Sequence, residues 1–176
     1  MLTQIPVRPI DLGSSSVTPA FATILGEAAA VCFEENRHLS GVQLSVDGMS
    51  KGTVEVVWTQ LDGAHKATHA DLHEATESGV YGAALLLVRQ LTGATAIDRS
   101  VKGGGFDWWI GTPDPSGLPF QGLVRLEVSC ILRGQPPDIR SRLKRKVRQT
   151  DASDPIAAAL ISNIEFSQPR VQVERK

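Results

Sequence analysis

Two apolar segments that each carry one carboxylate constrain the fold of this chain most. They span residues 105–110 (GFDWWI) and 123–132 (LVRLEVSCIL), and a short connection rich in Pro and Gly joins them. Side chains alternate between the two faces of a β-strand, so the second segment has one apolar face and one face that carries Glu127. Asp107 lies in the same way between two aromatic residues of the first segment. Charges this close to a core cost free energy unless they have partners, so the two acids mark a candidate site.

Composition and length favour one globular domain. The chain has 176 residues, of which 41% are hydrophobic and 21% charged, which excludes a disordered or fibrous protein. The formal net charge of -1 gives no overall basic field for nucleic acid, and the two cysteines, Cys32 and Cys130, suggest small core residues. The N-terminus has no basic segment followed by an apolar run, and no apolar run is long enough to span a bilayer. We therefore expect a cytoplasmic protein without membrane contact.

The periodicity of apolar residues predicts an extended arm over residues 1–18 and a single domain over residues 19–176. Helices are predicted at 19–38, 72–91 and 139–149, and strands at 42–46, 53–60, 95–99, 105–111, 123–132 and 159–166. Residues 62–65 are predicted as a loop and the segment from residue 167 as a polar tail. The fold class is α/β in the broad sense that includes α+β, with one mixed central sheet flanked by helices.

From residue 71 onward the predicted order is helix, three strands, helix, strand, preceded by a helix and a β-hairpin. This order, with acids on the second and third of those strands, resembles the restriction-endonuclease-like superfamily, the PD-(D/E)xK nucleases, whose core is αβββαβ. The resemblance covers about residues 71–167. It implies a hydrolase that cleaves phosphodiester bonds with Mg²⁺ (or Mn²⁺), with DNA favoured over RNA, acting as a homodimer or as a subunit of a larger nucleic-acid-processing or defence complex.

The resemblance also implies a ligand set for the metal. Asp107 matches the first acid of the family motif, Glu127 matches the acid of its acid-x-Lys element, and Glu77 matches a glutamate from the first core helix. These residue types suit a magnesium site, because Mg²⁺ is typically held by one or two carboxylates. A bound metal can also activate water for phosphodiester hydrolysis. In the alternative interpretation the acids pair with Arg99 or Arg125, or lie on a solvated face.

The lysine of the acid-x-Lys element is absent, because Ser129 occupies its position. In this superfamily that lysine can be replaced or can migrate to another element, and Lys102, Lys144 or Lys146 would fill its role. The second core helix would contribute Lys146 or Gln149 to the catalytic centre. Without a replacement the chain would be a catalytically inactive module that keeps the nuclease fold.

The segment 139–149 contains six of the 18 Lys and Arg residues and no acid. Like charges at this spacing repel one another, so an anionic partner such as a phosphate backbone is expected to compensate them. The predicted nucleic-acid contacts are Arg140, Arg142, Lys144, Arg145 and Arg148. The alternatives are a solvated basic face or a surface for an acidic protein partner.

Three histidines are spaced by four residues, namely His65, His69 and His73, and Glu77 continues the series. On one continuous helix they would share a face and could hold zinc. Asp71, however, has the position of the N-cap of the helix predicted at 72–91, and Gly93 has the position of the residue that ends it. This assignment leaves the first two histidines in the preceding loop and argues against a shared zinc site.

Overall fold

The computed structural model describes residues 3–6, 16–112, 122–151 and 157–176. The helices are α1 (Pro19–Glu35), α2 (Gly63–Thr68), α3 (Leu72–Thr92) and α4 (Pro136–Thr150). The strands are β1 (Thr3–Pro6), β2 (Val42–Gly48), β3 (Gly52–Val57), β4 (Thr95–Arg99), β5 (Trp108–Gly111), β6 (Val124–Ile131), β7 (Ala159–Glu165) and β8 (Arg170–Arg175). None of the helices in these ranges combines the length and the apolar composition that crossing a membrane requires.

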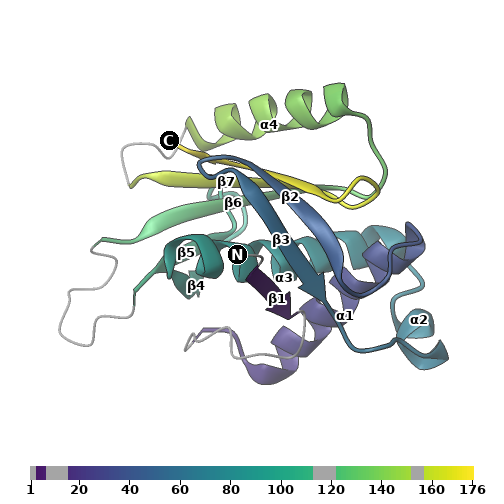
Figure 1. Cartoon of the computed structure of the whole chain (residues 1–176). Helices are drawn as coiled ribbons and strands as arrows, with labels where there is room; N and C mark the ends of the chain where they lie inside the picture. Colours follow the sequence, from purple (N-terminus) through teal and green to yellow (C-terminus); the bar gives the residue numbers. More distant parts are fainter. Residues whose placement is uncertain (1–2, 7–15, 113–121, 152–156) are drawn as a thin grey trace.

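The described strands form one mixed sheet in the order β1-β3-β2-β8-β7-β6-β5-β4. Strands β4, β5 and β6 form an antiparallel meander, and β7 lies parallel to β6 after the chain has crossed over through α4. Helix α4 covers one face of the sheet, while α1 and α3 lie on the other (Figure 1). The predicted fold class is therefore confirmed, with α3, β4, β5, β6, α4 and β7 forming the αβββαβ core.

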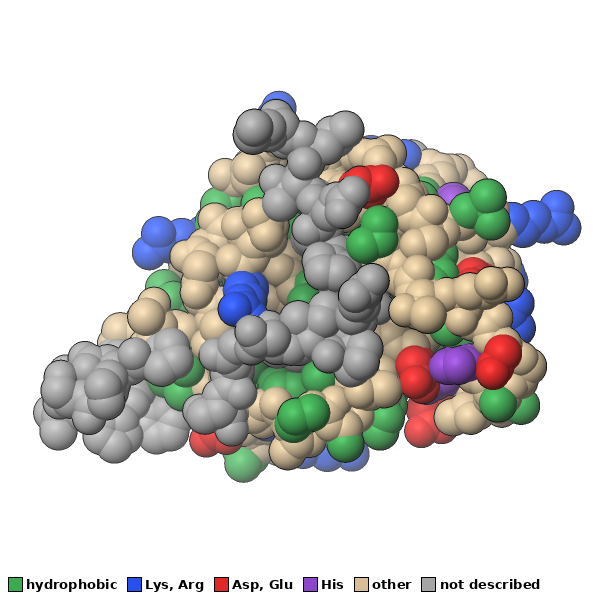
Figure 2. Space-filling model, turned by 60° about the horizontal axis from the view of Figure 1, so that its bottom comes forward, with side chains coloured by type: hydrophobic (Ala, Val, Ile, Leu, Met, Phe, Trp, Pro, Cys, Tyr) green, Lys and Arg blue, Asp and Glu red, His purple; other side chains and the backbone are tan. Residues whose placement is uncertain are grey.

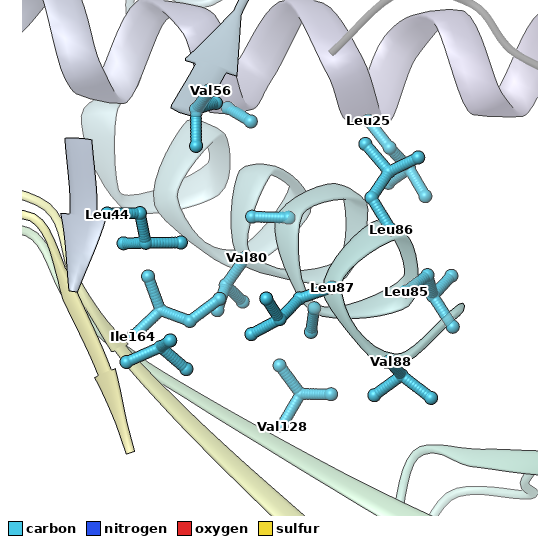
Figure 3. Close-up of a cluster of buried hydrophobic side chains, with 14 of the residues drawn as sticks. Leu25, Leu44, Val56, Val80, Leu85, Leu86, Leu87, Val88, Val128 and Ile164 are labelled. Carbon is cyan, nitrogen blue, oxygen red and sulfur yellow. The ribbon is translucent and has the colours of Figure 1, made fainter. Parts of the chain in front are cut away.

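The main hydrophobic core lies between α3 and the sheet. Figure 3 shows Val80 and Leu87 of α3 next to Val128 of β6 and Ile164 of β7. Leu87 and Ile164 are fully buried. The apolar stripe predicted for α3 thus faces the sheet, and the αL conformation of Gly93 ends this helix as the sequence predicts.

Two glycines allow α1 and α3 to pack with their backbones in close approach. A Cβ atom at Gly79 would lie 2.8 Å from the Cα and N atoms of Ala29, and one at Gly82 would lie 2.7 Å from the backbone oxygen of Leu25. Both distances are shorter than real Cβ contacts. The helix pair therefore requires glycine at these two positions of α3 and small or adaptable neighbours on α1.

Residues 62–65, predicted as a loop, lead into a short helix instead. Asp62 caps α2 because its carboxylate accepts from the backbone N–H groups of Ala64 (2.9 Å) and His65 (3.1 Å). The prediction of a loop was wrong because an Asp-Gly pair favours a turn and an N-cap equally well.

The C-terminal segment, predicted as a polar tail, contains a strand. Strand β8 pairs with both β7 and β2, and it buries Val171 and Val173 while its polar residues remain partly exposed. The sequence has this alternation of apolar and polar residues, but only two valines form it and charged residues surround them. Helix α4 also begins earlier than predicted, at Pro136, because proline is well tolerated in the first turn of a helix.

Candidate active site

The two predicted acids lie opposite each other, although the strand predicted over residues 105–111 begins only at Trp108 and Asp107 lies just before it. The antiparallel register pairs Trp108 of β5 with Leu126 of β6. Asp107 immediately precedes this pair and still bonds to β6, because its backbone N–H donates to the carbonyl oxygen of Leu126 at 2.8 Å. The same register places Asp107 opposite Glu127, so the structure brings the two acids together.

Asp107 is held in one orientation by two donors. The hydroxyl of Tyr81 on α3 donates to Asp107 Oδ1 at 2.8 Å, and the backbone N–H of Val128 donates to Asp107 Oδ2 at 2.8 Å. Burial and the neighbouring Asp107 carboxylate raise the pKa of Tyr81, so this hydroxyl remains a donor at neutral pH. Tyr81 was not among the residues predicted for the site.

Glu127 is a buried carboxyl with one cationic partner. It is only 1% exposed, and its Oε1 atom accepts a hydrogen bond from the ammonium group of Lys146 on α4. Burial, followed by the charge of Asp107, raises the pKa of Glu127 from 4.5 to about 7, and Lys146 opposes this shift. Glu127 therefore gains or loses its proton close to neutral pH.

Helix α4 supplies a second cation to the polar face of β6. The guanidinium Nε atom of Arg142 donates to the hydroxyl of Ser129 at 2.7 Å, and this serine is 3% exposed. Arg142 and Lys146 are one helical turn apart, and Ser129 and Glu127 are two residues apart on a strand. The two spacings match, so the inner side of α4 places one cation over each of the two β6 residues.

Two adjoining pockets meet at the acid pair, and both are lined by Tyr81, Asp107 and Lys146. The first pocket is also lined by Glu77, Ser129 and Arg142. The second is also lined by Arg99, Lys102, Glu127 and Gln149. The six residues predicted as catalytic or metal-binding therefore all line these two adjoining pockets, which are together called the cleft below.

Glu77 lines this cleft but stays apart from the other two acids. Its side chain is 66% exposed, and its carboxylate lies 4.0 Å from Nδ1 of His73. In the described part of the chain, no three His, Cys, Asp or Glu side chains are already gathered as the ligands of one ion. The acid pair is thus formed without the third ligand that the resemblance implied.

The two arginines considered as partners of the acids make other contacts. The guanidinium of Arg99 lies 4.7 Å from the ring centroid of Tyr81 and 4.9 Å from that of Trp108. Arg125 is buried and donates to the backbone carbonyl oxygen of Thr150 at the end of α4 at 3.0 Å. Arg99 thus reaches the cleft through the aromatic rings beside Asp107, which the sequence alone did not indicate.

The basic helix has two sides with different surroundings. Arg142 and Lys146 are half-buried against β6. The outward-facing basic residues are exposed to solvent, namely Arg140, Lys144, Arg145 and Arg148. Of the predicted nucleic-acid contacts, Arg142 therefore lies in the cleft and the other four form an exposed basic surface.

Comparisons of the chain with protein-family models, with curated proteins and with solved structures found no match.

Proposed function

We propose that this chain is a metal-dependent nuclease whose catalytic centre is Asp107, Glu127 and Lys146. The observation that carries the proposal is the pairing of two carboxylates, one just before β5 and one on β6, with a lysine from α4 bound to the second. A lysine thus reaches the acid pair from the following helix, although Ser129 occupies the motif position. We infer that Lys146 substitutes for the missing motif lysine.

The donor set fits a divalent cation. Asp107 and Glu127 offer hard oxygen atoms, and Mg²⁺ is typically held by one or two protein carboxylates together with water and substrate phosphate. A bound Mg²⁺ or Mn²⁺ would supply Lewis-acid chemistry and offset negative charge on the scissile phosphate.

The remaining roles follow from the positions of the side chains. Tyr81 and the backbone of Val128 hold the Asp107 carboxylate in place. Lys146 keeps positive charge next to Glu127 and, in the proposed mechanism, next to the attacking oxygen or the phosphate. Gln149 and Lys102 line the same cleft and would orient substrate oxygens by hydrogen bonding.

A cleavage assay tests this proposal with conservative changes. The wild type, Asp107→Asn, Glu127→Gln and Lys146→Met are each incubated with duplex DNA, single-stranded DNA and RNA in Mg²⁺ or Mn²⁺. We expect wild-type cleavage that each change lowers at least about a hundredfold, as loss of a directly acting charged group commonly does. Asp98→Asn serves as the control, because Asp98 is an exposed acid on the neighbouring strand β4. Cleavage that survives both Asp107→Asn and Glu127→Gln would refute the proposal.

A second candidate is a catalytically inactive module that binds nucleic acid through α4. The observation that favours it is that each acid already has protein partners: Asp107 has Tyr81 and Val128, and Glu127 has Lys146. This candidate predicts no cleavage by any form of the protein. It also predicts salt-sensitive binding to DNA that Lys144→Glu and Arg148→Glu weaken, measured by fluorescence anisotropy.

A further inference from the structure

A cluster of two histidines and a glutamate lies at the junction of α1 and α2, outside the cleft. His65 lies within α2, and His69 is the C-cap residue of the same helix. Nε2 of His65 lies 3.7 Å from Oε1 of Glu27 on α1, and Nε2 of His69 lies 3.6 Å from Oε2 of the same carboxylate. Two ring nitrogens thus face one carboxylate from a neighbouring helix.

His69 is the member of this cluster whose buried ring nitrogen lacks a hydrogen bond. Its side chain is only 9% exposed, and among the described residues its Nε2 atom has no hydrogen-bond partner. A buried polar atom without a hydrogen bond costs free energy and is rare in folded proteins. A ligand at this nitrogen would remove that cost.

His65 has the arrangement that is typical of a metal-binding histidine. Its Nδ1 atom lies 2.6 Å from Oδ1 of Asp62 and 3.3 Å from the backbone nitrogen of the same residue, so Asp62 fixes the orientation of the ring. When Nδ1 holds the ring proton, the Nε2 atom of the neutral ring presents a lone pair toward Glu27. A carboxylate that orients the far nitrogen of a histidine is a recurrent feature of zinc sites.

We propose that Glu27, His65 and His69 bind one Zn²⁺ ion, with the fourth position left for water. Imidazole nitrogens and a carboxylate form a ligand set that suits zinc and does not suit Mg²⁺. The two histidines approach different oxygens of the same carboxylate, His65 at 3.7 Å from Oε1 and His69 at 3.6 Å from Oε2 of Glu27. Ligands about 2.1 Å from a tetrahedral zinc ion are about 3.4 Å apart, so each histidine is near the distance at which it and one Glu27 oxygen could share an ion. Within the described part of the chain these side chains are not already arranged around one point, so binding would require them to move toward one another.

The ion would fasten α2, and with it the start of α3, to α1. Figure 2 shows the face of the molecule that lies at the bottom of Figure 1, and at its edge a histidine side chain lies between acidic side chains. Glu27 and His65 are each about one-third exposed, which gives the ion an entry path from solvent. None of the three proposed ligands lines either pocket of the acid cleft, so this site is independent of the proposed nuclease centre.

The sequence provides a matched control for this proposal. His73 continues the four-residue spacing of the other two histidines, but its side chain is 85% exposed and faces Glu77. His73→Gln removes one histidine from the same region without touching the proposed ligands.

Titration calorimetry with Zn²⁺ on the untagged full chain at pH 7.5 tests the site. The titrations use the Asp107→Asn background, which removes the proposed metal centre of the cleft as a second Zn²⁺ site. In this background we expect one Zn²⁺ per chain, which Glu27→Gln and His69→Gln abolish and His73→Gln retains. Asp62→Asn should weaken binding about tenfold, as loss of an orienting carboxylate does. Circular dichroism melts without metal check that each variant folds, because His69→Gln alters a buried position.

Substitution with Co²⁺ gives an independent measurement of the ligand set. We expect a visible spectrum of a nitrogen- and oxygen-ligated ion, without the charge transfer that a cysteine ligand would cause, and its loss in Glu27→Gln. Absence of Zn²⁺ binding in the wild type, or equal binding by folded Glu27→Gln, would show that the cluster is only an ion pair and would overturn the proposal. Neither result depends on nuclease activity.

Discussion

The two faces of the central sheet are built from opposite kinds of residues. On the side of α1 and α3 the buried groups are almost all apolar, and Gly79 and Gly82 bring the two helices into backbone contact. On the side of α4 the sheet buries Arg125, Glu127 and Ser129 beneath a helix rich in Lys and Arg. One face therefore supplies most of the hydrophobic stabilisation, and the other buries polar and charged groups.

This difference indicates where the function lies. Apolar burial stabilises a fold by roughly 25 cal/mol per Å². A buried ion pair is often no more stabilising than well-packed apolar residues of the same size. The α4 face retains Glu127 and its neighbours although an apolar face would serve stability at least as well. We therefore associate the α4 face, and the edge where it meets Asp107, with function.

The largest expected effect comes from truncating the apolar face. Leu87→Ala removes a fully buried side chain of α3 and should lower the free energy of unfolding by about 4 kcal/mol. Leu143→Ala, a buried residue of α4, lies in a small satellite cluster and should cost about 2 kcal/mol, since fewer atoms surround it. Urea denaturation of both variants measures the contrast. Equal losses would mean that the two faces contribute equally to stability.

Gly82→Ala tests the close approach of the two helices. The added methyl group would lie 2.7 Å from the backbone oxygen of Leu25, so α1 must move away, and we expect a loss of about 3 kcal/mol. Gly63→Ala in α2 is the matched control, because no atom lies within 4 Å of the methyl group there. The control should be neutral or slightly stabilising, since alanine favours helix. A neutral Gly82→Ala would show that the helix pair adapts.

Much of the fold follows from local sequence patterns. The apolar stripe of α3, the cap at Asp71 and the terminating Gly93 predicted this helix to within one residue of its observed end. Strand β8 and helix α2 were missed for physical reasons. Val171 and Val173 are too few to stand out, and they become a strand only because β7 and β2 offer open hydrogen-bonding edges on both sides.

The candidate site was predicted less completely than the fold. Alternation along the two strands identified Asp107 and Glu127, since a buried acid interrupts an apolar pattern. The choice of Lys146 among several lysines could not be made from sequence, because it depends on how α4 lies over β6. The roles of Tyr81 and Arg99 depend equally on tertiary packing between α3 and the strands.

The polar face is expected to make stability depend on pH. Because burial raises the pKa of Glu127 from 4.5 to about 7, the folded state binds more protons than the unfolded state between these values. The contribution of this group to stability is therefore fully present below pH 4.5 and is lost as pH rises through 7. We expect a loss of about 2 kcal/mol, less than the whole shift implies, because the cleft is open to water.

Urea denaturation at pH 5 and pH 8 without divalent ions measures this loss, and Glu127→Gln isolates it, since the amide does not titrate. The difference in stability between the wild type and Glu127→Gln should change by the stated amount over this interval. If the difference in the free energy of unfolding between the wild type and Glu127→Gln were the same at pH 5 and pH 8, the Glu127 carboxyl would be ionised at both pH values.

The smallest effect on stability, and the most specific one on binding, is expected from the outer side of α4. Lys144→Gln and Arg148→Gln alter exposed side chains and should each change the free energy of unfolding by less than about 0.5 kcal/mol. If these cations contact phosphates, each change should reduce the salt dependence of DNA binding, the slope of log K against log salt, by about 0.9. Lys51→Gln, an exposed lysine after β2, should leave the slope unchanged. If all three changes reduced the slope equally, DNA binding would depend only on the net charge of the protein. The outer face of α4 would then not be a specific DNA-binding surface.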